Sequence, residues 1–412
     1  MRLAVAGLGR LGLPLAAVLA AAGHQVVGVD PYAPEVVDAL RTASVGRFDE
    51  PGLADLILSL KPYAFQATTL YDRAMPGAEA SLIVVPTPSL PDGRFDSSAV
   101  VEAVGQIAAR TGPDHLIIVV STVQPGTMGG VVTEAAAGRP LAYCPQLIAL
   151  GSVINDLRQP DLCIVGAADA ETWARAARVL EPIYTEAPPG PPRGAPLSLI
   201  DAEIAKLAIN AALVAKVAFA LAICDGCEGT PGADAARVLA TVGLDSRIGP
   251  KFLAPGGPVG GPCLPRDSLA LAGWLYDGGA AVDSQGLPKA AMDANRATTR
   301  RIIGLLRAYR RVAVLGLAYK VGTSVTEASL GAAVGEALAS RKGHGFALFA
   351  HDPMVDAFYA DAQDAVEKAE AVLVATPHPE YAALDYQGKP VIDVWGIVPD
   401  GPNVRRLGRW YA

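Results

Sequence analysis

The chain has 412 residues, of which 51% are hydrophobic and 18% are charged, and its net charge is -7. This length allows two or three domains with cores of their own, and the composition is typical of a globular protein. The negative charge gives no electrostatic reason to expect nucleic-acid binding. No run of eighteen apolar residues predicts a membrane span, and a strand expected within a few residues of Met1 argues against a secretory signal. Five scattered cysteines are typical of free thiols in a reducing compartment, so we expect a cytoplasmic protein.

The first segment, "RLAVAGLGRLGLPLAAVLAAAGHQVVGVD" (2–30), predicts a strand, an alanine-rich helix and a second strand that ends at Asp30. Gly7 suits a tight turn, Gly9 lets a pyrophosphate approach the backbone, and Gly12 lets the helix pack on the strand. Asp30 is placed to accept hydrogen bonds from the ribose hydroxyls, which favours NAD over NADP because a 2′-phosphate would be repelled. A purely structural glycine turn is the alternative. We predict an NAD site in which the same turn also contributes Leu8, Arg10 and Leu11.

Two further apolar runs end in proline and hydroxyl-bearing residues. They are "SLIVVPTPS" (81–89) and "LIIVVSTVQPGT" (116–127). The carboxyl ends of parallel strands form the ligand-binding edge of such a sheet. We therefore predict that the cofactor site also includes Pro86, Thr87, Ser121 and Thr122.

The segment "EAPPGPPRGAP" (186–196) is rich in proline and glycine and predicts a linker. Residues 197–227 then contain no proline and no glycine before Gly226, which predicts one long helix. The helix is apolar on more than one face, so we expect it to be buried between domains or between subunits. Glu203, Lys206 and Asn210 follow one another at helical spacing on it. This stripe either is exposed to solvent or faces a site, and we favour the site because buried polar groups need partners.

The loop "PGGPVGGPCLPRD" (255–267) places Cys263 among glycines and prolines. Such a loop has few side chains to pack, so core filling explains the thiol poorly, although a buried inert thiol is the alternative. Loops in unusual backbone conformations often present reactive groups. We predict that Cys263 is reactive.

The last third of the chain repeats the pattern of the first. "RVAVLGLAYK" (311–320), "GFALFAHDP" (345–353) and "AVLVATPHP" (371–379) echo the first strands, and "PVIDVWG" (390–396) adds another. The repeat lacks the glycine triplet, so we expect it to bind something other than the dinucleotide. His378 follows a predicted strand and is expected in a surface loop. The fold class predicted is α/β, with two Rossmann-like doubly wound parallel sheets and a long central helix, divided into domains 1–195, 196–298 and 299–412.

With these motifs in order along nearly its whole length, the chain resembles nucleotide-sugar dehydrogenases of the UDP-glucose/GDP-mannose dehydrogenase family. The motifs are "GLGRLGLPLA", "VPTP", "STVQPGT", "GSVINDLRQPD", "EIAKLAIN", "DSRIGPKFLAPGGPVGGPCLPRD" and "GLAYKVGT". The resemblance implies NAD as cofactor, a nucleotide sugar as substrate, and a homodimer formed through the long helix.

The resemblance also implies roles for individual residues. Cys263 matches a covalent nucleophile that forms a thioester, and Lys206 matches a residue that stabilises alkoxide charge. Asn210 would share that role, and Asp267 would position a catalytic water. The catalytic set implied further includes Thr122 and Gln146. The substrate contacts implied, besides Lys206 and Asn210, are Arg247, Phe252, Gly257, Gly260 and Lys320.

The sequence departs from the family at several positions. Gln146 replaces a carboxylate linked to thioester hydrolysis, and glutamine cannot accept a proton as a carboxylate does. Glu327 stands at about the position of a family arginine, Arg266 replaces a lysine, and "LAI" (221–223) replaces "NEI".

These departures leave four hypotheses about the function open. The first is oxidation at C6 to a uronic acid through a Cys263 thioester, and the second is an oxidation that stops at an aldehyde or ketone. A 3-hydroxyacid-type dehydrogenase and a non-catalytic relative are the third and fourth. We expect no metal site, because the histidines are dispersed and the pair Cys224 and Cys227 is best explained by helix packing.

Overall fold

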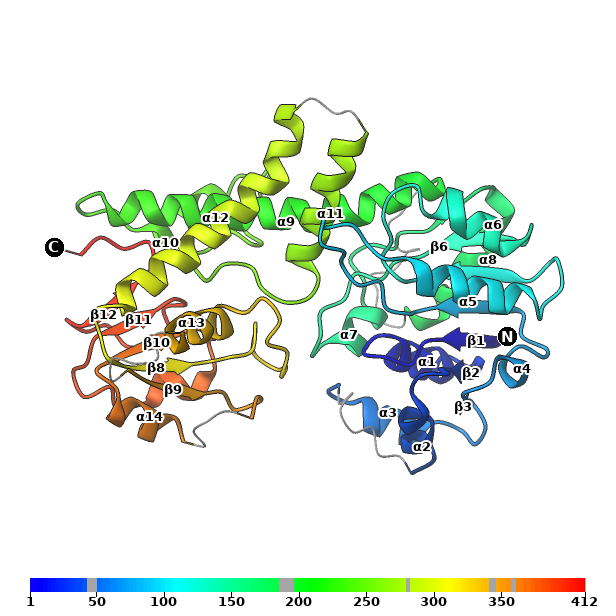
Figure 1. Cartoon of the computed structure of the whole chain (residues 1–412), viewed down its shortest axis with the longest axis horizontal. Coiled ribbons are helices and arrows are strands. Elements are labelled where there is room, and N and C mark those ends of the chain that lie inside the picture. The colour runs from blue at the N-terminus through cyan, green and yellow to red at the C-terminus, as the bar shows by residue number, and fades with distance from the viewer. Residues whose placement is uncertain (43–49, 185–195, 279–281, 341–345, 357–360, 412) are drawn as a thin grey trace. The chain divides into compact units, whose positions relative to one another are not determined.

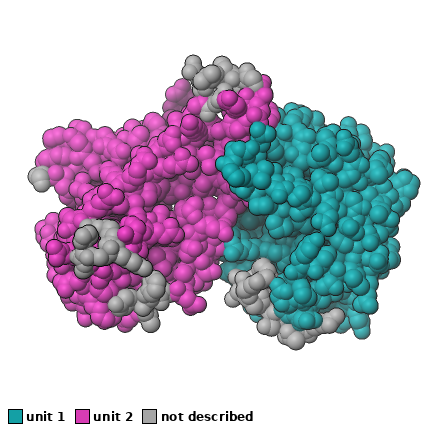
Figure 2. Space-filling model, viewed as in Figure 1, with its two compact units in different colours: residues 1–207 teal, residues 208–412 magenta. Residues whose placement is uncertain are grey.

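The computed structural model describes residues 1–42, 50–184, 196–278, 282–340, 346–356 and 361–411. Two compact units, Met1–Leu207 and Ala208–Ala412, make up the chain (Figure 2). The boundary between them falls inside the longest helix, α9 (Leu199–Glu228) (Figure 1). The predicted linker lies almost entirely outside the described residues, and the division into three domains stays a prediction.

The first unit contains a seven-stranded sheet with the order β3-β2-β1-β4-β5-β6-β7. Its first six strands are parallel and follow the order of a Rossmann sheet, and β7 pairs antiparallel with β6 at the edge. The strands are β1 (Arg2–Ala6), β2 (Gln25–Val29), β3 (Phe65–Thr68), β4 (Ala80–Ile83), β5 (Leu116–Val119), β6 (Leu141–Tyr143) and β7 (Gly166–Ala167).

The helices of the first unit pack their apolar residues on the strands. One core cluster joins Leu3 and Val5 of β1 to Leu15 and Leu19 of α1, and it extends to α7 and α8. These strands are buried runs because both faces of the sheet are covered. The helical segments are α1 (Gly12–Ala21), α2 (Pro34–Thr42), α3 (Leu53–Ser59), α4 (Tyr71–Ala74), α5 (Ser98–Ala108), η2 (Met128–Val132), α6 (Thr133–Ala136), α7 (Val153–Arg158), α8 (Ala170–Leu180) and η3 (Glu181–Ile183).

The second unit contains the greater part of α9, the helical segments that follow it and a five-stranded parallel sheet with the order β12-β11-β10-β8-β9. Read from β9, this is the 2-1-3-4-5 order of flavodoxin-like sheets. The helical segments are α10 (Ala235–Gly243), α11 (Leu264–Asp277), α12 (Val282–Leu306), α13 (Leu330–Ala339), α14 (Ala362–Lys368) and η4 (Pro379–Ala383). The strands are β8 (Arg311–Leu315), β9 (Ala347–His351), β10 (Ala371–Val374), β11 (Val391–Asp393) and β12 (Val404–Arg406).

Alternate residues of β8 point to opposite faces of this second sheet. Val312 and Val314 pack with α12 and α13, and Ala313 and Leu315 pack with α14. Helices therefore cover both faces, which confirms the predicted α/β class with two doubly wound sheets and a long central helix.

Candidate active site

The turn after β1 has the geometry of a dinucleotide-binding turn. Gly7 has φ +93°, and a Cβ on Gly12 would lie 2.0 Å from the carbonyl oxygen of Gly7, so only glycine fits both positions. A Cβ on Gly9 would meet no protein atom within 4 Å. The space at Gly9 fits a pyrophosphate held at the N-terminus of α1, in the turn that also contains Leu8, Arg10 and Leu11.

Asp30 follows β2 and organises this turn. Its carboxylate accepts the N–H of Leu8 at 2.9 Å and the N–H of Tyr32 at 3.1 Å. The side chain is only half-buried, and each carboxylate oxygen has a second acceptor site. Asp30 can therefore hold the loop and still accept hydrogen bonds from a ribose.

Hydroxyl groups join the loops that follow β4 and β5. Thr87 Oγ1 donates to the carbonyl of Thr122 at 2.8 Å, and Ser121 Oγ donates to the carbonyl of Val85 at 2.7 Å. Pro86 lies exposed between these contacts. The predicted cofactor residues of the two loops are thus brought together at one edge of the first sheet.

Glu203 has a structural role that the sequence did not reveal. Its side chain is fully buried, and its carboxylate accepts the N–H of Gly126 at 2.8 Å and of Met128 at 2.7 Å. Burial raises the pKa of Glu203 to about 7, although the N–H donors of this turn act in the opposite direction. Glu203 therefore fastens the loop that carries Ser121 and Thr122 to α9. The spacing E-x-x-K indicated a common stripe but could not indicate this partner.

Two other predicted catalytic residues lie in the first unit. Lys206 is 5% exposed and follows Glu203 on α9 by almost one turn. Gln146 lies in the loop after β6, where its amide nitrogen donates to the carbonyl of Cys144 at 2.9 Å. Its side chain is therefore held in place, but an amide cannot act as a general base.

The glycines before Cys263 are required by what packs against them. A Cβ on Gly256 or Gly257 would lie 2.8 Å or 3.0 Å from the ring of Trp395. A Cβ on Gly261 would lie 2.7 Å from the ring of Tyr319. The φ of Gly261 is also +82°, so both the contact and the backbone conformation disfavour any other residue there. The glycine loop, residues 255–263, is therefore packed tightly against the turns of the C-terminal sheet.

Cys263 is exposed and stands at the N-cap of α11, where the helix dipole favours an anion. Asp267 lies one turn further along α11, is 2% exposed, and accepts the amide of Asn210 at 2.6 Å. The structure thus brings together three of the predicted catalytic residues: a thiol, a buried carboxylate and an amide that orients it.

The predicted substrate contacts are distributed over the second unit. Gly257 and Gly260 lie in the glycine loop, and Lys320 Nζ lies 5.9 Å from the centre of the Tyr319 ring. The remaining two are far more exposed: the side chain of Arg247 is 86% exposed and pairs with Asp245, and Phe252 is 47% exposed at a φ of +63°.

His378 corrects one expectation. It is 3% exposed and does not lie in a surface loop, because its ring packs edge-on against Tyr381 and its Nε2 lies 3.4 Å from a carboxylate oxygen of Asp352. Cys224 and Cys227 belong to an apolar cluster between α9 and α10, as expected for helix packing. Among the described residues, no group of histidine, cysteine and acidic side chains could hold a metal ion.

The structure contains a dinucleotide-binding turn and an exposed thiol near a buried carboxylate. These features are typical of a dehydrogenase that uses a dinucleotide cofactor and a cysteine nucleophile. Comparison with known proteins gives the family. Sequence models of the UDP-glucose/GDP-mannose dehydrogenase family match residues 1–187 as the NAD binding domain, 200–296 as the central domain and 313–400 as the UDP binding domain. The chain belongs to this family, and it is an NAD-dependent oxidoreductase that acts on nucleotide sugars.

Individual relatives agree with this assignment. The UDP-glucose 6-dehydrogenase AglM of Haloferax volcanii is 34% identical over 93% of both chains. A UDP-glucose dehydrogenase structure from Pyrobaculum islandicum superposes with a TM-score of 0.86 at 31% identity, covering 100% of this chain and 98% of that one. A UDP-D-ManNAc dehydrogenase from Pyrococcus horikoshii gives 0.86 at 25% identity, covering 99% of both.

Within the part of the chain that the structure describes, α9 alone is long and apolar enough to cross a membrane. Two of its polar side chains have buried partners inside the protein: Glu203 accepts the N–H of Met128, and Asn210 donates to Asp267. Such contacts are those of a core helix, so its length and composition are weak evidence for a membrane span.

Proposed function

We propose that the protein oxidises the C6 hydroxyl of a nucleotide-linked sugar to a carboxylate, using two molecules of NAD per sugar, with Cys263 as the covalent nucleophile. The observation that carries this proposal is an exposed thiol at a helix N-terminus, one turn from the buried Asp267. The family assignment and the relatives named UDP-glucose 6-dehydrogenase support the same reaction.

The chemistry needs a charge stabiliser, a nucleophile and an activated water. NAD, when bound, supplies the hydride acceptor. The hydroxyl loses its proton as hydride leaves, and the cation of Lys206, helped by the amide of Asn210, stabilises the alkoxide charge that develops. The Cys263 thiol adds across the aldehyde carbonyl to give a thiohemiacetal. This becomes a thioester when its hydroxyl loses a proton and its carbon loses a second hydride, which a second NAD would accept. Water then cleaves the thioester to a carboxylate and the free thiol.

Hydrolysis is the step that the departures from the family affect. Gln146 cannot accept a proton, and its amide is held by Cys144. Asp267 is a buried carboxylate oriented by Asn210, so we propose it as the group that activates or positions the water. Thr122, which Thr87 holds through its carbonyl, is proposed to act at the cofactor side.

Substrate contacts, assembly and location belong to the same proposal. The residues proposed to contact the nucleotide sugar are Lys206, Asn210, Arg247, Phe252, Gly257, Gly260 and Lys320. A homodimer through α9 is supported by apolar side chains on that helix that remain exposed in the single chain, including Phe219 at 47% and Ile200 at 40%. Light scattering at micromolar concentration should give the mass of a dimer. We propose the cytoplasm as the location.

Screening UDP-, GDP- and dTDP-linked sugars for NADH formation tests the reaction. The proposal predicts about two NADH per sugar consumed, since each oxidation transfers one hydride. A ratio near one would instead support the version in which the enzyme stops at an aldehyde or ketone. Absence of turnover with every nucleotide sugar would favour a 3-hydroxyacid-type dehydrogenase or a non-catalytic relative.

A further inference from the structure

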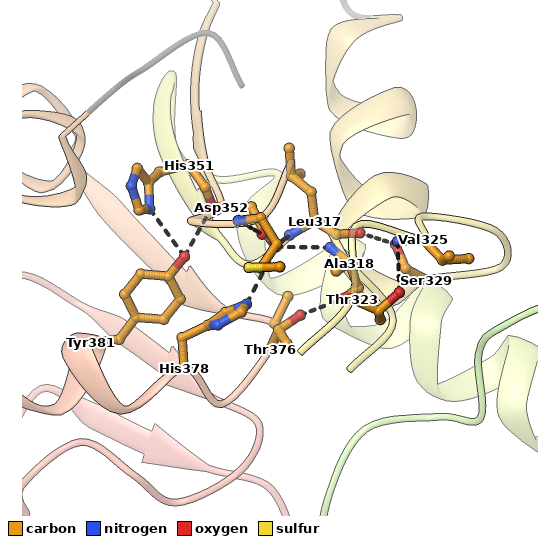
Figure 3. A network of polar contacts seen from close by, with 12 residues as sticks. Leu317, Ala318, Thr323, Val325, Ser329, His351, Asp352, Thr376, His378 and Tyr381 are labelled. Carbon is orange, nitrogen blue, oxygen red and sulfur yellow. Dashed lines mark hydrogen bonds and ion pairs between the residues drawn. The ribbon is translucent and has the colours of Figure 1, made fainter. Parts of the chain in front are cut away.

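A buried carboxylate at the carboxyl end of the C-terminal sheet is surrounded by donors (Figure 3). Asp352 Oδ2 accepts the N–H of Leu317 at 2.7 Å and of Ala318 at 2.8 Å, and Oδ1 accepts the N–H of Met354 at 2.8 Å. His378 Nε2 lies 3.4 Å from Oδ2. Burial alone would raise the pKa of Asp352, but the imidazole and the three N–H groups lower it to about 2. The carboxylate is therefore an anion at neutral pH.

Two of these donors, the N–H groups of Leu317 and Ala318, lie at the start of the loop at 317–329, which connects β8 to α13. The loop is fastened at the same place by two hydroxyl groups: Ser329 Oγ donates to the carbonyl of Leu317 at 2.6 Å, and Thr376 Oγ1 donates to the carbonyl of Ala318 at 2.6 Å. Leu317 is half-buried, and Ala318, Ser329 and Thr376 are buried. If one of these hydrogen bonds is lost, water therefore cannot fully replace it. The beginning of the loop is thus held by Asp352, Ser329 and Thr376 (Figure 3).

The same loop packs against the glycine loop. The N–H of Gly261 donates to the carbonyl of Glu327 at 2.9 Å, and the ring of Tyr319 occupies the space that a side chain at Gly261 would need. Cys263 follows two residues later, at the start of α11. A chain of short contacts therefore leads from Asp352 through the 317–329 loop to the candidate nucleophile.

We propose that Asp352 is a positioning residue which, together with His378, fixes the 317–329 loop and thereby sets the position of Cys263. Sheet packing does not require this pair, since the equivalent carboxylate of the first sheet, Asp30, accepts two backbone N–H groups with no histidine among its described partners. The His378 imidazole is found in the unit in which the loop after the first strand is the longer of the two. The inference rests on the proposed function for the role of Cys263, but its test below can be read without turnover.

The test compares His378→Leu, which removes the imidazole next to Asp352, with His378→Gln, whose amide can donate near the position of Nε2. The comparison variant is Tyr381→Phe, whose lost hydroxyl bonds the ring and the carbonyl of His351 and the N–H of Gly316. This change disturbs the surroundings of His378 but leaves the imidazole beside Asp352. The first measurement is the rate of alkylation of Cys263 by iodoacetamide, read on the Cys263 peptide by mass spectrometry. The second is the KM for the nucleotide sugar beside the dissociation constant for NAD.

In His378→Leu we expect alkylation to slow about fivefold, because the thiol leaves its place at the helix N-terminus. We expect the nucleotide-sugar KM to rise about fivefold or more while NAD binding is unchanged. His378→Gln should restore most of both, and Tyr381→Phe should lower only the melting temperature. If His378→Leu does not fold, Thr376→Val removes the bond to the Ala318 carbonyl and is expected to give the same pattern.

Unchanged alkylation and KM in His378→Leu, or the same changes in Tyr381→Phe, would overturn the inference. Slower alkylation in a protein that turns over no nucleotide sugar would uphold the positioning role and reject the proposed function. Normal turnover with unchanged alkylation in every variant would uphold the proposed function and reject the positioning role of His378 and Asp352.

Discussion

The first strand–helix–strand units of the two sheets close in the same way. Gly316 has φ +97° and Gly331 would place a Cβ 1.9 Å from the Gly316 carbonyl, just as Gly12 would lie 2.0 Å from that of Gly7. Four residues separate the glycines of the first pair, and fourteen separate those of the second. Both units therefore use a pair of glycines to pack the first helix closely on the first strand, although the loop between strand and helix differs in length. The short loop leaves room for a pyrophosphate, and the long one packs against the loop of Cys263.

The carboxylates that follow the second strand of each unit also differ. Asp30 is half-buried and accepts two backbone N–H groups, whereas the Asp352 side chain is fully buried and has His378 beside it. The half-buried carboxylate keeps acceptor sites that a ligand can reach, whereas the buried carboxylate is enclosed by donors of the protein. The same position in the fold is thus partly open to solvent in one half and used for buried internal contacts in the other.

The largest effects are expected at the paired glycines. Gly12→Ala and Gly331→Ala should each lower the free energy of unfolding by about 3 kcal/mol, because the new Cβ meets a main-chain oxygen that cannot move freely. Chemical denaturation measures both. Gly105→Ala on α5 is the control, since no atom lies within 4 Å of its Cβ. If only one of the two substitutions lowered the free energy of unfolding by this amount, the two glycine pairs would not be equivalent.

Buried carboxylates in the two units, Glu203 and Asp352, should respond to pH in opposite directions and by similar amounts. Its pKa is raised to about 7, so it contributes stability that is present below its unfolded pKa of 4.5 and is lost as pH rises through about 7. Relative to Glu203→Gln, the wild type should lose about 2 kcal/mol between pH 5 and 8. Denaturation at both pH values measures this, and a difference that does not change with pH would contradict it.

Asp352 should show the reverse dependence. Its pKa is lowered to about 2, so its stabilisation is present above the unfolded pKa of 3.8 and is lost as pH falls toward 2. Asp352→Asn should cost about 2 kcal/mol at pH 7, and the gap to wild type should narrow between about pH 4 and 2. Denaturation curves over that range are the check. A gap that widens in acid would show that the carboxylate is not held as an anion.

The smallest effect is expected for Asp30, where the ligand and not the fold is affected. Asp30→Asn keeps an oxygen that can accept the Leu8 N–H, so stability should change by less than about 1 kcal/mol. NAD affinity should fall about tenfold, and the preference over NADP should shrink because the negative charge is gone. Calorimetry with both dinucleotides measures this, and a wild-type preference for NADP would show that Asp30 has another role.

Local pattern predicted much of this molecule. The apolar runs of β1, β2, β8 and β10 and the glycines at the first turn are signals within a few residues of one another, so sequence alone located them. The closure by Gly316 and Gly331 was missed because ten extra residues hide the spacing. What lies far apart in sequence could not be predicted. Trp395 explains Gly256, and Asp352 explains the burial of His378, but each pair meets only through the folded sheet.

The central claim is that the glycine loop presents Cys263 as a covalent nucleophile. The most direct measurement is peptide mass spectrometry of the enzyme quenched in acid while it turns over a nucleotide sugar identified by the screen. The account predicts a sugar-nucleotide adduct on the Cys263 peptide, absent without NAD and absent in Cys263→Ser, which should also lose most of its activity. NADH formation with no adduct on Cys263, together with full activity of Cys263→Ser, would contradict the account.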